Sequence, residues 1–213
     1  MILEGFKFSI SFLKDNFSKL LLIVSLPFIL ELIITSISLN HMTNESSGEF
    51  VSVPLILIIQ TWAQCTIIFY IHNQQTSRSI SDLYIYTLYK LPFIVLWGLF
   101  VVLVVALGLL LFIVPGIYIA LRYSFYTFEI LLSQKKGSES MKDTFAMTKS
   151  KTVQIFFYFL TPMLITILLT VMIFLFVEVM IISILYTYLL IVFFTIYTYY
   201  LYDRLKGDTN GIE

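Results

Sequence analysis

Six long apolar stretches run along the chain, separated by short polar connections. They cover roughly 17–39, 51–71, 91–113, 116–133, 153–177 and 180–202. Each is continuous and about 20 residues long, which is the length that an α-helix needs to cross a hydrocarbon core of ~30 Å. Strands of a membrane barrel would instead alternate apolar and polar residues. The pattern predicts an all-α integral membrane protein with six transmembrane helices, forming a single membrane domain over residues 1–213.

The last two apolar stretches nearly merge. From Val153 to Tyr202 the only charged residue is Glu178. One uninterrupted helix of that length would measure about 75 Å, far more than a bilayer accommodates. We therefore expect a tight hairpin near Glu178.

Three of the polar connections have a helical pattern of their own. Apolar residues recur at steps of three and four before the first stretch, with lysines and serines on the opposite face, and weaker versions occupy 80–88 and 141–148. Such segments are typical of amphipathic helices at a membrane surface, and Ser140 is a plausible N-cap for the third. The chain thus divides into three units, 2–71, 76–133 and 137–202, each a surface helix followed by a transmembrane hairpin. Residues 6–27 match residues 141–162 without a gap, which favours parallel repeats.

Composition agrees with a membrane location. Hydrophobic residues make up 59% of the chain and charged residues 12%, against about 25% charged in soluble domains. Of the thirteen Lys and Arg residues, twelve lie at the two ends or in the second and fourth connections. They are Lys7, Lys14, Lys19, Arg78, Lys90, Lys135, Lys136, Lys142, Lys149, Lys151, Arg204 and Lys206. Because basic loops stay in the cytoplasm, both termini are predicted to be cytoplasmic.

The fourth connection is the most basic part of the chain. It carries Lys135, Lys136, Lys142, Lys149 and Lys151. Such a cluster determines topology, and it also attracts anionic lipid headgroups by about 1 kcal/mol for each charge near the surface. We expect membrane lipids to be partners, whereas the net charge of zero gives no indication of nucleic-acid binding.

A few ionisable residues fall inside the apolar stretches, where they are costly and mark candidate functional sites. They are Glu31, Arg122 and Glu129, with Glu178 near an end. In the fourth stretch Tyr118, Arg122, Tyr126, Glu129 and Ser133 recur at steps of four, four, three and four, which predicts one polar stripe along a single helix face. The candidate ligand-binding or lipid-binding residues are therefore Arg122, Glu31, Glu129, Tyr118 and Tyr126.

Three roles are open for Arg122. Counting ~1.5 Å per residue, Arg122 lies about 9 Å deep and Glu31 about 12 Å deep, close enough in depth for an ion pair. Arg122 therefore either pairs with Glu31 or Glu129 to fix helix register, or binds an anionic headgroup or substrate. The third alternative is that its side chain extends to the outer surface.

Catalytic and metal motifs are absent from the sequence. His41 and His72 are predicted on opposite sides of the membrane, and Cys65 is the one cysteine. No Ser/His/Asp arrangement, phosphate loop or paired histidine motif occurs. We therefore expect a non-enzymatic protein without a metal or cofactor.

The stretch Val114–Tyr123, reading VPGIYIALRY, followed by Ser138–Phe145, reading SESMKDTF, resembles the YciC-like family of bacterial inner-membrane proteins. It is also similar to the membrane domain of some glycerophosphodiester phosphodiesterases, although the soluble phosphodiesterase domain has no counterpart here. The resemblance implies six spans in a bacterial cytoplasmic membrane, a turn at Pro115 and Gly116, and a role connected with the envelope and its lipids.

The leading hypothesis is a membrane protein that acts in lipid or envelope homeostasis by binding an anionic lipid or a membrane partner. One alternative is a small transporter or channel that uses Glu31, Arg122 and Glu129. Another is an immunity protein against a membrane-active peptide. A membrane-protein partner or a second copy of the chain fits each of these.

Overall fold

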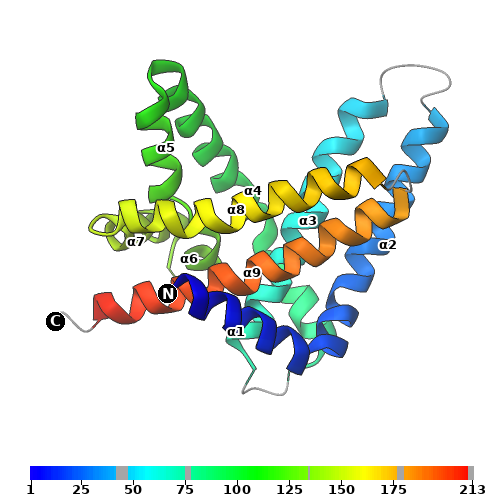
Figure 1. The fold of residues 1–213 in the computed structure, drawn as a ribbon, viewed down its shortest axis with the longest axis horizontal. Coiled ribbons are helices and arrows are strands. Elements are labelled where there is room, and N and C mark those ends of the chain that lie inside the picture. The colour runs from blue at the N-terminus through cyan, green and yellow to red at the C-terminus, as the bar shows by residue number, and fades with distance from the viewer. Residues whose placement is uncertain (42–47, 75–77, 134, 177–179, 211–213) are drawn as a thin grey trace.

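The computed structural model describes residues 1–41, 48–74, 78–133, 135–176 and 180–210, and the elements within them are α-helices (Figure 1). In chain order they are α1 (Ile2–Asp15), α2 (Phe17–His41), α3 (Gly48–His72), α4 (Ile80–Leu111), α5 (Ile113–Arg122), α6 (Tyr126–Leu132), α7 (Gly137–Thr148), α8 (Thr152–Phe176) and α9 (Met180–Asn210). The predicted all-helical class is confirmed for these residues.

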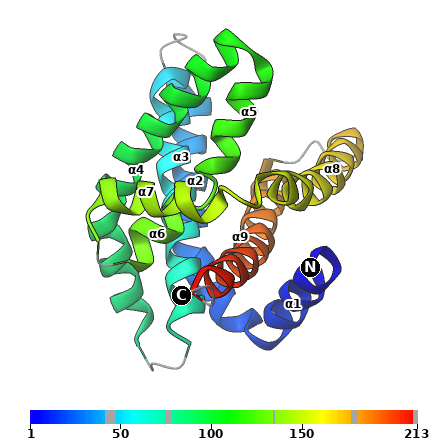
Figure 2. The same cartoon turned by 90° about the vertical axis from the view of Figure 1, so that its left-hand side faces the viewer.

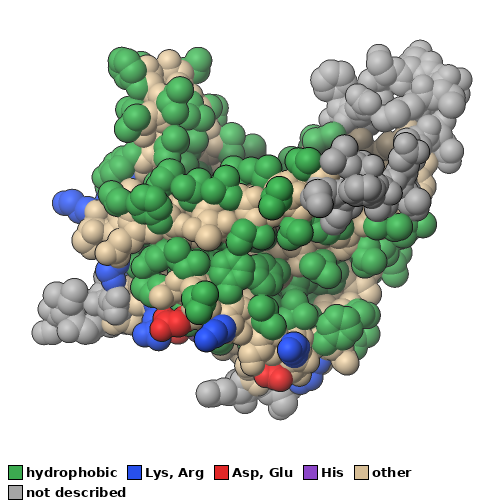
Figure 3. Space-filling view, in the orientation of Figure 1, with side chains coloured by type: hydrophobic (Ala, Val, Ile, Leu, Met, Phe, Trp, Pro, Cys, Tyr) green, Lys and Arg blue, Asp and Glu red, His purple; other side chains and the backbone are tan. Residues whose placement is uncertain are grey.

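Five of the described helices are long and apolar enough to cross a membrane. The qualifying segments are Phe17–Ser38, Ser52–His72, Ile80–Leu111, Thr152–Val171 and Ile181–Gly207. Figure 3 shows the same division on one face of the molecule, where hydrophobic side chains cover the upper part and charged side chains gather along the lower edge and the left end. An apolar face with charges at its margin is what a bilayer requires of the outside of an integral protein.

The predicted fourth span is not one helix. The stretch 116–133 is divided between α5, a helix of ten residues that begins at Ile113, and α6, a helix of seven residues, which are separated by Tyr123, Ser124 and Phe125. Neither helix reaches the ~17 residues that a crossing needs, so six crossings stay a prediction. The sequence offered no Pro or Gly to mark this break. The ring of Phe125 at the break is fully buried.

Helices α4 and α5 form a hairpin that depends on two glycines. A Cβ atom on Gly108 would lie 2.9 Å from the Cα of Gly116, and a Cβ on Gly116 would lie 2.7 Å from the backbone nitrogen of Leu109. The backbones therefore approach more closely than side chains would permit. The turn itself falls at the extended residue Phe112, while Pro115 lies in the first turn of α5, where its missing N–H costs nothing.

The three predicted surface segments have different outcomes. The first is a separate helix, α1, which ends before Asn16 and packs against α9. The second is continuous with the following span in the 32-residue helix α4, capped by the Ser79 hydroxyl, so the prediction of a separate element was wrong. The third is α7, but its N-cap residue is Lys136, and Ser140 lies inside the helix.

The first and third predicted units share their helix order but not their packing. Both α2 and α8 have 25 residues with a proline at the eleventh, Pro27 and Pro162. However, α2 packs along α3, whereas the main contacts of α8 are with α5, and Figure 2 shows α8 standing apart from α2 and α3. The prediction of a hairpin at Glu178 lies outside the described residues.

Candidate functional site

Arg122, the last residue of α5, is the most unusual side chain in the described structure. Its exposed fraction is 0%, and it is the largest side chain among those that are fully buried. None of its Nε, Nη1 and Nη2 atoms has a hydrogen-bond partner within the described residues. A buried guanidinium normally forms paired hydrogen bonds to acidic groups, because desolvating its charge is expensive.

Two aromatic rings and a helix end offset part of this cost. The guanidinium carbon lies 3.7 Å from the centroid of the Phe145 ring and 5.6 Å from that of Tyr118. A desolvated cation–π contact contributes about 2 kcal/mol, and a cation at a helix C-terminus gains about 0.3–1 kcal/mol. Leaving buried charged donors unpaired costs more than about 1–3 kcal/mol each. The free-energy cost of burying three unpaired nitrogens therefore exceeds the stabilisation that the aromatic rings and the helix end provide.

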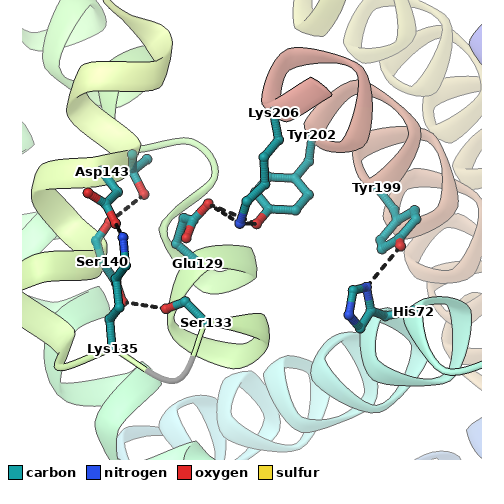
Figure 4. Close-up of polar contacts among 10 residues, drawn as sticks. His72, Glu129, Ser133, Lys135, Ser140, Asp143, Tyr199, Tyr202 and Lys206 are labelled. Carbon is teal, nitrogen blue, oxygen red and sulfur yellow. Dashed lines mark hydrogen bonds and ion pairs between the residues drawn. The ribbon is translucent and has the colours of Figure 1, made fainter. Parts of the chain in front are cut away.

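Helix α7 crosses the break between α5 and α6 and holds it in place. The Thr148 hydroxyl donates to the carbonyl oxygen of Arg122 at 3.0 Å, which satisfies one of the carbonyls left free at a helix end. At the other end of α7, the hydroxyls of Ser133 and Ser140 lie 2.9 Å apart, and Lys135 pairs with Asp143 at 2.6 Å (Figure 4). The hydrogen bond and negative charge of Asp143 raise the pKa of Lys135.

A basic pocket of about 430 Å³ lies beside Phe145. Its lining is Tyr123, Met141, Lys142, Phe145, Ala146 and Lys149. Lys142 and Lys149 are both exposed, and neither has an ion-pair partner within the described part of the chain. Phe145, 38% exposed, therefore lines the pocket that carries the two lysines and also contacts the buried guanidinium of Arg122.

Glu129 does not pair with Arg122, contrary to one prediction. Its Oε1 atom accepts hydrogen bonds from Lys206 Nζ and from the Tyr202 hydroxyl, each at 2.8 Å. In Figure 4 the carboxylate points from α6 toward these two α9 residues. The break after Arg122 explains the difference, since it rotates α6 relative to α5. Glu129 therefore connects α6 to the C-terminal helix.

Glu31 does not reach Arg122 either. The Gln60 amide on α3 donates to both carboxyl oxygens of Glu31 at 3.2 Å, and Glu31 is buried between helices. The estimate of similar depth ignored the direction in which each side chain points around its helix. The predicted ion pair of Arg122 with Glu31 is therefore wrong.

The predicted polar stripe is divided between α5 and α6. Tyr118 shares a helix with Arg122 and lies near its guanidinium, at 44% exposure. Tyr126 instead faces α4, where its hydroxyl lies 2.7 Å from the position of a Cβ on Gly98. Of the five candidate binding residues predicted from the sequence, the structure brings together only Arg122 and Tyr118. Tyr126, Glu129 and Glu31 lie in separate surroundings.

The five basic residues predicted at the membrane surface also differ in role. Lys142 and Lys149 line the pocket, while Lys135 forms an ion pair with Asp143. Lys136 is exposed at the start of α7, and Lys151 is half-buried before α8. Sequence reasoning missed Phe145 as a cover over Arg122, although the steps among Met141, Phe145 and Thr148 placed it on the apolar face of α7.

Comparison of the chain with models of protein families, with curated proteins and with solved structures found no significant match. The resemblance to the YciC-like family therefore stays a prediction.

Proposed function

We propose that the chain is a non-enzymatic protein of the bacterial cytoplasmic membrane that acts in lipid or envelope homeostasis by binding an anionic lipid headgroup between α5 and α7. The observation that carries the proposal is the buried guanidinium of Arg122, whose three nitrogens have no hydrogen-bond partner within the described residues. A phosphate supplies the paired acceptors and the negative charge that such a group requires.

The proposal includes a topology. Helices α5 and α6 together form one broken crossing, giving six crossings in all with both termini in the cytoplasm. Irregular backbone at membrane depth is tolerated where protein buries it, and Phe125 at the break is buried. Helix α7 follows this crossing on the cytoplasmic side and packs back against the break, and the long side chains of Lys142 and Lys149 extend from it toward the anionic headgroups of the cytoplasmic leaflet.

Binding proceeds in two steps. The headgroup first enters the pocket beside Lys142 and Lys149, which have no competing ion-pair partner within the described residues. The half-exposed ring of Phe145 then moves aside, and the Arg122 guanidinium donates to the phosphate. The lost cation–π contact, worth about 2 kcal/mol, is offset by charge-assisted hydrogen bonds of about 1.5–3 kcal/mol each.

Lipid binding is favoured over transport by the placement of the three buried ionisable residues. A transport pathway through Glu31, Arg122 and Glu129 needs them to share a polar passage. Instead, Glu31 bonds to Gln60, Glu129 bonds to Lys206 and Tyr202, and Arg122 contacts aromatic rings.

Native mass spectrometry of the protein released from bilayers of phosphatidylglycerol and phosphatidylcholine tests the proposal. Arg122→Ala is expected to reduce the ratio of retained phosphatidylglycerol to phosphatidylcholine about tenfold, equivalent to about 1.4 kcal/mol. Arg78→Ala is the matched control, since Arg78 also lies over a phenylalanine ring, Phe69 at 5.3 Å, but is exposed. Equal lipid ratios in wild type and Arg122→Ala would refute the proposal.

A further inference from the structure

Tyr123 separates two hollows of opposite character. On one side it lines the basic pocket with Lys142 and Lys149. On the other side it lines an apolar groove of about 340 Å³ between α4 and α5. The two hollows are therefore neighbours that share one wall.

The apolar groove follows the α4–α5 hairpin. Its lining includes Val101, Val105 and Leu109 from α4 and Ala120 from α5. Ser124 also borders the groove, but its hydroxyl donates to the carbonyl oxygen of Leu121 at 2.9 Å. The small side chains of Ala106 and Ala120 leave the hollow between the two helices.

The groove has a length suited to a lipid tail. Residues 101 to 109 of α4 cover about 12 Å along the helix axis. One leaflet contributes about half of the ~30 Å hydrocarbon core. The groove is thus nearly as long as one leaflet of hydrocarbon is thick, and its end next to Tyr123 adjoins the basic pocket.

We propose that this groove holds an acyl chain of the same lipid whose phosphate binds beside Lys142 and Lys149. The inference rests on the proposed function and deepens it, because it identifies the ligand as an intact anionic phospholipid. A free phosphate or a detached headgroup would use the basic pocket alone. The occupant is fixed by the two adjoining hollows, one cationic and one apolar, in the order in which a phospholipid presents its headgroup and its tail.

The groove is expected to orient the lipid rather than to add much to its binding free energy. Lipid tails are as apolar as leucine side chains, so moving a tail from the bilayer into the groove gains no hydrophobic free energy. What it gains is close packing and a defined position. A tail held against α4 and α5 delivers its phosphate to Tyr123 and the two lysines.

The test uses phosphatidylglycerol that carries a photoreactive diazirine midway along one acyl chain, in phosphatidylcholine bilayers. Ala120→Phe fills the groove from an exposed position on α5. Leu103→Phe is the matched control, because Leu103 is exposed on α4 and does not line the groove. Cross-links are expected to concentrate on 101–109 and 117–124 and to fall about fivefold in Ala120→Phe, with no change in Leu103→Phe. Thermal unfolding verifies that both variants fold.

Two contrary outcomes are distinguishable. Cross-links spread evenly over α4, α5 and α8, and insensitive to Ala120→Phe, would overturn the acyl groove. If the cross-links were spread evenly but Arg122→Ala still reduced the retained phosphatidylglycerol, headgroup binding would stand and only the acyl groove would be rejected. If neither variant changed lipid retention or cross-linking, both proposals would fail.

Discussion

The ring of Phe145 covers the guanidinium of Arg122, with the guanidinium carbon 3.7 Å from the ring centroid. Phe145 also lines a pocket that carries two exposed lysines. The cation has no hydrogen bond within the described residues, and its cover is partly exposed. In the proposed function, this cation binds the lipid phosphate after the Phe145 ring moves aside.

Arg122→Met is expected to stabilise the delipidated protein while abolishing its response to anionic lipid. Removing a buried cation that lacks partners recovers its desolvation cost, so we expect the free energy of unfolding to rise by about 1–3 kcal/mol. Added phosphatidylglycerol should raise the melting temperature of the wild type through linkage, and leave that of Arg122→Met unchanged. Thermal unfolding with and without the lipid measures both effects. A melting temperature that falls in the delipidated variant would show that Arg122 has partners in solution.

Gly116→Ala is expected to open the α4–α5 hairpin. The added Cβ would lie 2.5 Å from the Leu109 side chain and 2.7 Å from its backbone nitrogen. Overpacking of this kind costs about 1–3 kcal/mol, which thermal unfolding measures. Gly207→Ala is the control, since a Cβ at Gly207 has nothing within 4 Å, and alanine favours a helix. Equal melting temperatures of Gly116→Ala and wild type would contradict the close approach.

Glu129→Ala is expected to loosen the end of α9. The change removes the acceptor shared by Tyr202 and Lys206. Because Lys206 is 41% exposed, water solvates part of its charge after the substitution. We expect the free energy of unfolding to fall by about 1–2 kcal/mol, a value between those typical of surface ion pairs and of buried ion pairs. Hydrogen exchange in 199–207 should accelerate, while exchange in α2 should not. Unchanged exchange at both places would remove Glu129 as the connection between α6 and α9.

The ion pair of Lys135 with Asp143 predicts an effect of alkaline pH on α7. Asp143 raises the pKa of Lys135 in the folded protein, so the stabilisation is present below the ordinary lysine pKa of about 10.4 and is lost as pH rises through the raised value. Labelling of Lys135 by an amine-reactive reagent near that pH should be slower in wild type than in Asp143→Asn. Equal labelling rates would contradict the pairing.

The sequence predicts the helices of this protein well where apolar stretches are long. The stretches at 17–39 and 153–177 correspond to α2 and α8 within about two residues, because apolar length alone determines such segments. The break at 123–125 could not be predicted. The residues there are Tyr123, Ser124 and Phe125, with no Pro or Gly. The break contacts α7 through Thr148 and buries the Phe125 ring, and a local sequence pattern does not reveal such tertiary contacts.

The candidate site was predicted in part. Arg122 was identified because a cation in an apolar stretch is costly whatever surrounds it. The residues around Arg122 were not predicted, because counting residues gives the depth of a side chain in the membrane but not the direction in which it points around its helix. Depth placed Arg122 beside Glu31, although Glu31 faces Gln60 on α3. Phe145 and Lys206 contact their partners across many residues of sequence, and a local pattern does not reveal such contacts.

Solid-state NMR distance measurements between the side-chain nitrogens of Arg122 and the phosphorus of phosphatidylglycerol test the central claim most directly. The ¹⁵N label is placed in arginine, and Arg122→Lys identifies which signals belong to this residue. The account predicts a dipolar contact between phosphorus and the Arg122 guanidinium at hydrogen-bonding range in bilayers that contain phosphatidylglycerol. A guanidinium without phosphorus contact, in protein that retains the lipid, would contradict it.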